Sequence, residues 1–181
     1  HVTWKILEKY HDGLIATSAC IAGCVGRSVK EILKCEEFPG AADAKIVKED
    51  NERILNTYLD KMQTLFDRDH FFIELQNHHF PLETEIMNRV REIAKSRNIR
   101  TTVGIDAHYL NKEDAEIHEY WLCMQTKKTI SSPDRMRFSG DGYWVHTSDE
   151  VVELFPNDLD ALDTTLDIAE RCHYSHEKPK H

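Results

Sequence analysis

The chain has 181 residues, of which 40% are hydrophobic and 30% charged, and its formal net charge is −9 at pH 7. This mixture is typical of a globular protein that can bury a core, and no apolar run approaches the ~20 residues that a membrane-spanning helix needs. The acidic balance argues against a broad nucleic-acid surface, because contacts to phosphates need clustered Lys and Arg.

Residues 1–10 have the pattern of the middle of a helix, without an initiator Met or a signal-peptide pattern. We therefore expect the chain to be part of a longer protein. Five cysteines are irregularly spaced: Cys20, Cys24, Cys35, Cys123 and Cys172. An odd, irregular set does not fit a secreted disulfide framework, so a reducing cytoplasmic location is expected.

Strand and helix patterns alternate through the first part of the chain. A short apolar run at 14–18 predicts a buried strand, and a weak helical pattern follows up to a loop at 36–43. Further along, the sequence predicts a helix over 54–66, a strand at 71–75, a helix after Pro81 and a strand over 101–106. This alternation predicts a parallel α/β fold, either a barrel or an open sheet, with functional residues at the carboxyl ends of the strands.

The last third has a different pattern. A helix capped by Asn111 is predicted up to residue 126, followed by a polar stretch at 127–142 and a short strand at 143–146. Thr147 and Glu150 have the spacing of a capping box for the next helix. A final helix is expected over 159–169, and the chain is polar and expected to fray after Cys172.

The segment Thr101-Thr-Val-Gly-Ile-Asp-Ala-His108 is the strongest candidate for chemistry. If the strand continues through it, Asp106 and His108 point to the same face, because alternate side chains of a strand do so. A carboxylate and an imidazole side by side are two ligands suited to a divalent metal. The alternative is a surface turn in which the Asp holds the His by a hydrogen bond.

Three other places follow or end predicted strands. Cys20 is a soft metal ligand, a nucleophile or a small core residue, and the core is favoured because free cysteine is among the most buried residue types. Glu74 ends an apolar strand, where a carboxylate must be paired, hydrogen-bonded or metal-bound unless it lies on a solvated face. His78 and His79 are adjacent, so at most one is expected to face a site, and an ordinary loop histidine is the simpler interpretation of each.

Several ordered segments together resemble the PHP (polymerase and histidinol phosphatase) domain of bacterial DNA polymerase III α subunits. The matching segments are GLIATSAC at 13–20, FFIELQNH at 71–78, IDAHYL at 105–110, LCMQTKKT at 122–129, SPDRMRF at 132–138, GDGY at 140–143 and TLDIAERC at 165–172. They cover nearly the whole chain in order.

The resemblance implies a partial PHP-type distorted (β/α)7 barrel with a helical C-terminal extension. Residues 1–126 would form the C-terminal portion of the barrel, and 127–181 the end of the PHP domain and its connection toward the polymerase palm. Carried over by position, the metal ligands are Cys20, Asp106 and His108, with Glu74 and His78 near the site.

Two departures from the family are evident. The family opens with a His-x-His strand and supplies further ligands before the segment where this chain begins, and this chain contains no His-x-His. The family usually has Thr-Asn where this chain has Gly104-Ile105. We therefore expect this chain to hold only part of the family's ligand set.

The function implied by the resemblance is DNA-directed DNA synthesis by the parent chain, with Mg²⁺ in a palm domain beyond residue 181. The PHP domain would be a phosphoesterase with up to about three Zn²⁺ or Mn²⁺ ions, acting as a 3′–5′ proofreading exonuclease. This chain alone is expected to be inactive. The expected partners are DNA and other replisome subunits. The alternatives are a non-catalytic PHP scaffold that stabilises the polymerase and docks partner subunits, and a stand-alone PHP phosphatase.

Overall fold

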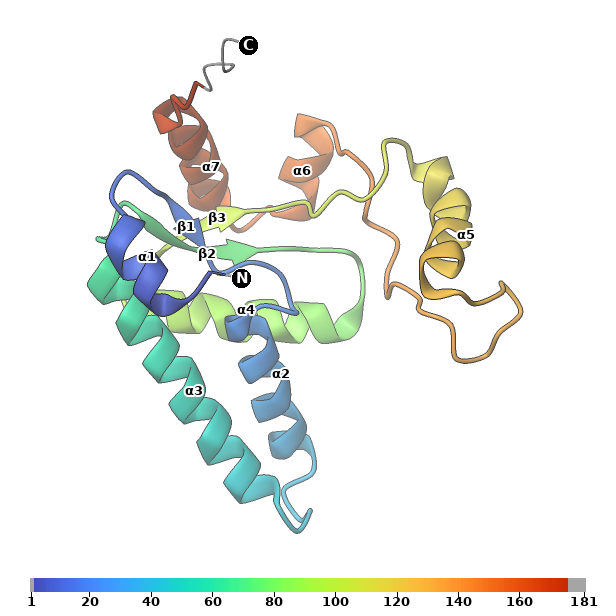
Figure 1. The fold of residues 1–181 in the computed structure, drawn as a ribbon, viewed down its shortest axis with the longest axis horizontal. Coiled ribbons are helices and arrows are strands. Elements are labelled where there is room, and N and C mark those ends of the chain that lie inside the picture. Colours follow the sequence, from blue (N-terminus) through green and yellow to red (C-terminus); the bar gives the residue numbers. More distant parts are fainter. Residues whose placement is uncertain (1, 176–181) are drawn as a thin grey trace.

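A computed structural model describes residues 2–175 and contains a three-stranded parallel sheet with helices on both sides (Figure 1). The strands are β1 (Ala16–Thr17), β2 (Phe71–Leu75) and β3 (Arg100–Val103), and they pair in chain order. The helices are α1 (Trp4–Tyr10), α2 (Cys24–Glu37), α3 (Ala44–Leu65), α4 (Pro81–Ser96), the 3-10 helix η1 (Lys112–Asp114), α5 (Ala115–Thr126), α6 (Ser148–Leu154) and α7 (Leu159–Arg171). The predicted α/β class is confirmed. Over the described residues the sheet is open, with no closed barrel.

The central strand β2 accounts for the core. Phe71, Phe72, Ile73 and Leu75 are all buried, as a parallel strand covered on both faces requires. Helices α2, α3 and α4 lie on one side of the sheet in Figure 1, and α6 and α7 on the other. Pro81 begins α4, where its fixed φ suits the first helical turn and its missing N–H costs nothing.

The outer edge of β3 is covered by α7. The Val103 backbone N–H donates to the Thr165 hydroxyl oxygen at 3.1 Å, and the Thr102 and Thr165 hydroxyls lie 3.0 Å apart. A strand edge normally exposes unpaired backbone groups. Here a helix side chain satisfies one of them, so the C-terminal helix packs directly on the sheet.

Three strand predictions need correction. The strand predicted over 101–106 ends at Val103, because the backbone turns and Asp106 has a left-handed φ of 41°. The strand predicted at 143–146 does not form, and only an isolated parallel bridge joins Tyr109 to Trp144. The Tyr143 carbonyl accepts hydrogen bonds from the His108 and Tyr109 amides, so this stretch pairs with the turn after β3. Only Ala16–Thr17 of the predicted buried strand at 14–18 pairs, and Leu14 is 48% exposed.

The helix predictions are more accurate, and differ mainly at their ends. Helix α2 reaches Glu37, so the loop predicted at 36–43 is shorter, and α3 begins ten residues before the apolar pattern that predicts it, at Ala44 rather than Ile54. The capping box is present, with the Glu150 amide donating to the Thr147 hydroxyl and the Thr147 amide donating to the Glu150 carboxylate.

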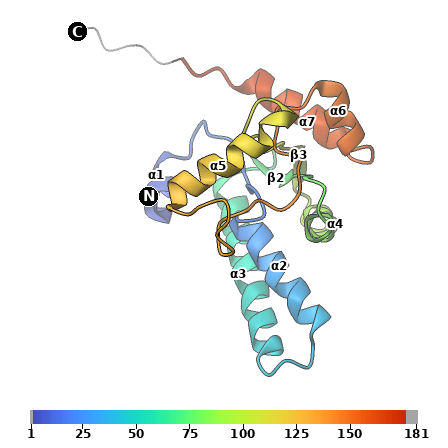
Figure 2. The same cartoon turned by 90° about the vertical axis from the view of Figure 1, so that its right-hand side faces the viewer.

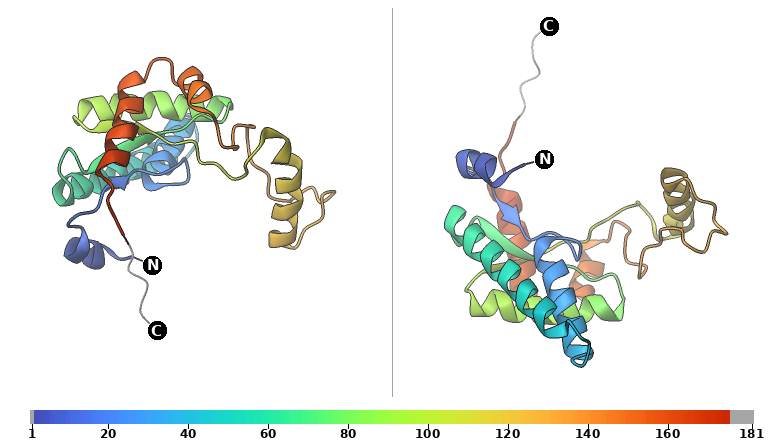
Figure 3. Two further views of the ribbon diagram at one scale, coloured as in Figure 1. Left: turned by 90° about the horizontal axis from the view of Figure 1, so that it is seen from above. Right: turned by 60° about the horizontal axis from the view of Figure 1, so that its bottom comes forward.

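Helix α5 stands away from the sheet, at the end of two extended segments (Figures 1 and 3). Seen from the side in Figure 2, it passes in front of the sheet, while α2 and α3 extend below. Within residues 2–175, no helix has both the length and the apolar character needed to span a membrane.

Candidate functional site

The turn after β3 brings Asp106 and His108 together. Their side chains approach to 3.5 Å, between Asp106 Oδ1 and His108 Nε2, and both are about one third exposed. The predicted closeness of the two side chains is present, although a turn produces it rather than strand alternation. The backbone of His108 is held by its own N–H, which donates to the Tyr143 carbonyl at 2.8 Å. Asp tolerates the left-handed φ of this turn better than most residues.

His78 lies immediately behind this turn and is 1% exposed. Its Nδ1 donates to the Glu83 carboxylate at 2.7 Å, and its Nε2 donates to the Ile105 carbonyl at 3.2 Å. Burial by itself lowers the pKa of His78, but the hydrogen bond and charge of Glu83, together with the Ile105 carbonyl, outweigh it and leave the pKa raised. Because both ring nitrogens are engaged, His78 lies near the candidate site without facing it as a ligand.

Tyr143 joins His78 to His108. Its ring stacks on His78, with centroids 4.1 Å apart and planes 11° from parallel, and meets the edge of His108 at 5.6 Å. Its hydroxyl donates to the Ser139 carbonyl at 2.7 Å. Burial, followed by the nearby carboxylates of Glu83 and Asp106, raises the pKa of Tyr143 to about 12. The phenol therefore stays protonated and keeps its hydrogen bond at neutral pH.

Glu74 serves to connect the strands. Its carboxylate accepts hydrogen bonds from the Thr17 hydroxyl at 2.8 Å and from the Gln76 amide at 2.7 Å, and its backbone N–H donates to the Ser18 hydroxyl at 3.0 Å. A Cβ atom on Gly104 would lie 2.1 Å from its Oε1 atom. The carboxylate thus occupies the space that a side chain at position 104 would need.

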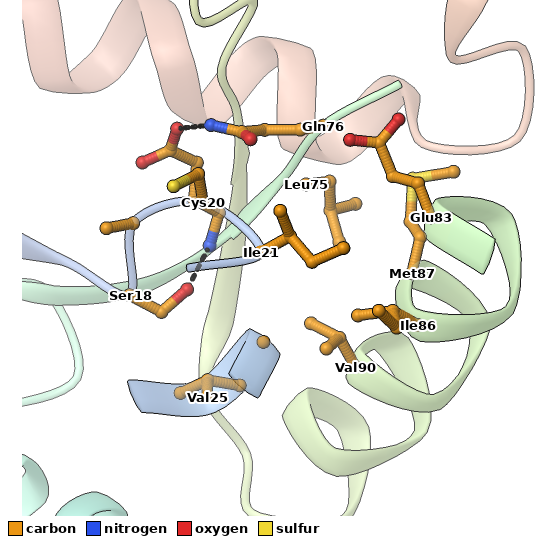
Figure 4. Close-up of a pocket in the computed structure, with 13 residues that line it drawn as sticks. Ser18, Cys20, Ile21, Val25, Leu75, Gln76, Glu83, Ile86, Met87 and Val90 are labelled. Atoms are coloured by element: carbon orange, nitrogen blue, oxygen red, sulfur yellow. Dashed lines mark hydrogen bonds between the residues drawn. The ribbon is translucent and has the colours of Figure 1, made fainter. Parts of the chain in front are cut away.

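Cys20 lines a small pocket between β2, α2 and α4 (Figure 4). Glu74 and Gln76 line the same pocket, and the floor is apolar, with Val25, Ile86 and Val90 among its residues. The Gln76 carbonyl oxygen is buried there without a hydrogen-bond partner. Asp106 and His108 do not line this pocket, although Asp106 and Cys20 both lie close enough to Tyr143 to raise its pKa.

Of the three predicted metal ligands, the structure brings Asp106 and His108 within 3.5 Å of each other. Across residues 2–175, no three His, Cys, Asp or Glu side chains are grouped with the spacing of a metal site. Asp106 and His108 have the donor chemistry of a divalent-metal site and fit as two of its ligands.

Sequence reasoning missed Glu83 and the role of Tyr143. Glu83 is in the first turn of α4 and is 4% exposed, an unusual burial for a carboxylate. The available signal was an acidic residue in the first turn of a helix that Pro81 begins, five residues after a histidine. For Tyr143, the sequence offered no such signal, because its partners come from β2 and β3 ends far away in the chain.

Comparison with known proteins gives a consistent result. Residues 1–78 match the family model described as the PHP domain. The DNA polymerase III subunit alpha of Saccharopolyspora erythraea is 31% identical over 168 residues, which is 92% of this chain and 13% of that protein. The subunits of Thermus aquaticus and Borreliella burgdorferi are 30% and 32% identical, over 93% and 92% of this chain and 12% and 13% of their own length. The chain thus spans about an eighth of these relatives.

Proposed function

Residues 1–78 belong to the PHP domain family, and on this premise we propose that the chain is the PHP region of a DNA polymerase III alpha-type replicase. The observation that carries the proposal is similarity to these polymerase subunits over 92% of the chain. The parent protein would extend DNA with Mg²⁺ in its palm domain and would contact DNA and other replisome subunits. The open sheet described here would be part of a PHP-type (β/α)7 barrel.

We further propose that the PHP domain is a metal-dependent phosphoesterase, acting as a 3′–5′ exonuclease. Asp106 and His108 would hold a Zn²⁺ or Mn²⁺ ion, with Cys20 as a softer thiolate ligand. A bound metal ion would supply a Lewis acid and an activated water for phosphoester hydrolysis. The exposure of the Asp106–His108 pair supports this proposal, since a 3′ end of DNA must reach the site.

A non-catalytic scaffold is the second candidate, and one observation favours it. Glu74 and His78 are both fully engaged in internal hydrogen bonds between strand ends, the arrangement expected of structural residues. In this alternative, the residues around β2 and β3 would brace the polymerase without binding metal.

The test uses the full-length protein that contains this chain, as wild type and as Asp106→Asn. Primer extension, 3′-end nuclease activity and bound metal by elemental analysis are measured on the same samples. We expect both proteins to extend primers. The variant should lose its bound metal, and its nuclease rate should fall at least ~100-fold. Asp134→Asn is the matched control, because Asp134 is exposed and pairs only with Lys128.

Each part of the proposal has its own contrary outcome. Absence of primer extension in the wild type would contradict the replicase. If the wild type extends primers but shows neither metal binding nor nuclease activity that depends on Asp106, the phosphoesterase proposal is contradicted. The non-catalytic scaffold would then be the remaining candidate.

A further inference from the structure

His78 is the most deeply buried polar side chain near the candidate site, and every polar atom of its side chain is used. Its imidazole and the Glu83 carboxylate form an ion pair at 2.7 Å with side chains only 1% and 5% exposed. Removing two charges from water costs several kcal/mol per ion, and an apolar pair of the same size is often at least as stable. A contribution to stability is therefore not enough to explain a buried pair of this kind.

The pair is anchored on both sides. The Glu83 carboxylate also accepts the His78 backbone N–H, so Glu83 fixes both the main chain and the ring of His78. On the other face of the ring, the loop at 139–142 packs against the His78 backbone. The Asp141 amide donates to the His78 carbonyl at 3.2 Å, and a Cβ on Gly140 would lie 1.8 Å from that oxygen. The backbone of His78 is therefore held by this loop as well as by Glu83.

The far nitrogen of the ring contacts the residue before Asp106. His78 Nε2 donates to the Ile105 carbonyl at 3.2 Å, and the next residue has the left-handed φ of 41°. This conformation is strained for a residue with a side chain, even for Asp, so contacts from the surroundings help to hold it. The hydrogen bond from His78 fixes the peptide that enters this turn.

Tyr143 fixes the other end of the turn. It stacks on the His78 ring, and its backbone carbonyl accepts the His108 N–H at 2.8 Å. His78 therefore touches the peptide before Asp106 directly and the amide of His108 through Tyr143. Both proposed ligands take their positions from one buried ring.

We propose that His78, locked by Glu83, is the positioning residue for the Asp106–His108 pair. This inference rests on the proposed phosphoesterase function. His78 touches neither substrate nor metal in this scheme, and acts through the Ile105 carbonyl and the Tyr143 ring. Positioning residues behind metal ligands typically change metal affinity or activity by about 10–100-fold when they are removed.

Two substitutions separate the two hydrogen bonds of the ring. The amide nitrogen of His78→Asn lies near the place of Nδ1 and keeps the contact with Glu83, but the side chain is too short to reach Ile105. The longer side chain of His78→Gln reaches toward the Ile105 carbonyl but loses the hydrogen bond with Glu83. His78→Gln is therefore combined with Glu83→Gln, which avoids an unpaired buried charge. His79→Asn is the neighbouring control, because His79 is exposed and pairs with Asp141.

The first readout is amide hydrogen exchange of residues 104–110 in the metal-free full-length protein. The second is the affinity for Mn²⁺ alone, and the third is nuclease kcat and KM. We expect His78→Asn to speed exchange of this segment about tenfold or more and to weaken Mn²⁺ binding about 10–100-fold, with kcat falling more than KM changes. The double variant and His79→Asn should stay within about threefold of wild type.

Equal effects of His78→Asn and the double variant, or a change in melting temperature alone, would overturn the positioning role. Should His78→Asn fail to fold, the double variant still decides: it keeps the contact with Ile105, so exchange at 104–110 that is about tenfold or more faster than in wild type overturns the proposal. A wild type without metal-dependent nuclease activity, but with the expected contrast in exchange, would refute the proposed function and leave the positioning role. Metal-dependent nuclease activity without the contrast in exchange would support the proposed function and refute the positioning role.

Discussion

Gly104 is the residue that lets the Glu74 carboxylate lie against the end of β3. A Cβ at this position would lie 2.1 Å from Glu74 Oε1 and 2.8 Å from its Cδ, so the whole carboxylate would have to move. Moving it would break the hydrogen bonds that it accepts from Thr17 and Gln76. The residue that departs from the family pattern is thus matched to a neighbour on the adjacent strand.

We expect Gly104→Ala to lower the free energy of unfolding by about 1–3 kcal/mol, the usual range for overpacking. In a Glu74→Ala background, the same substitution should cost less than about 0.5 kcal/mol, because the atoms that it meets are gone. Chemical denaturation of the four proteins of this double-mutant cycle measures the difference. Gly40→Ala is the control, since no atom lies within 4 Å of its Cβ. Equal costs in both backgrounds would show that the two residues are not matched.

At this scale, local spacing predicted what lies close in the chain. Asp106 and His108 are two residues apart, so their proximity follows from almost any extended or turning backbone. Glu83 and Tyr143 were not predictable as partners of His78, because their contact depends on how three separate loops pack. Burial of Glu83 is decided by that packing, and a sequence pattern records only that a carboxylate stands near a helix start.

Among the elements, the contact between α7 and the edge of β3 includes a hydrogen bond from a strand amide to a helix hydroxyl. Thr165 accepts from the Val103 amide at 3.1 Å and also donates to the Ala161 carbonyl at 3.0 Å within its own helix. Valine has the same shape as threonine without the hydroxyl. Its introduction would leave the Val103 amide without this partner.

Thr165→Val should therefore reduce the free energy of unfolding by about 1–3 kcal/mol, the cost of leaving a part-buried donor unsatisfied. Thr64→Val provides the comparison, because the Thr64 hydroxyl is exposed and bonds only the Asp60 carbonyl in its own helix. Thermal unfolding of the two variants gives the contrast. A smaller loss at position 165 than at 64 would mean that the edge of β3 does not depend on this helix.

The elements themselves were predictable to different degrees. Helices with a long apolar stripe, such as α4 and α7, appear where periodicity predicts them, because the stripe is what packs on the sheet. Strand lengths were overestimated, since apolar and β-branched residues mark a strand but do not show where its neighbour stops pairing. The run at 143–146 has strand-like residues, yet its hydrogen bonds go to the turn after β3.

For the whole molecule, the main feature is the exposed face of α5. Large apolar side chains spaced three or four residues apart form this face: Ile117 is 67% exposed, Tyr120 49%, Trp121 56% and Met124 72%. Acidic residues at 113 and 114 precede this stripe, and Lys127 and Lys128 follow it. In an antiparallel pair of α5 helices, Ile117 would meet Met124, and the acidic end of one helix would meet the basic end of the other.

We expect the 181-residue chain to self-associate through this face, with a dimer that grows with concentration. Trp121→Glu should shift the chain toward the monomer, and added salt should weaken the dimer because its ends are held by charge. Sedimentation velocity over a range of concentrations measures both. Phe38→Glu is the control, because Phe38 is 61% exposed at the end of α2 and does not belong to α5. A monomer at every concentration, or equal effects of both variants, would contradict the prediction.

The loop at 139–146 has a consequence for synthesis of the protein. A nascent chain already contains Asp106 and His108 when it has been made as far as residue 110, but the carbonyl that holds His108 belongs to Tyr143. The ring that stacks on His78 comes from the same later residue. Until that stretch has left the ribosome, the pair lacks these contacts, so this site is completed after the strands that support it have been synthesised.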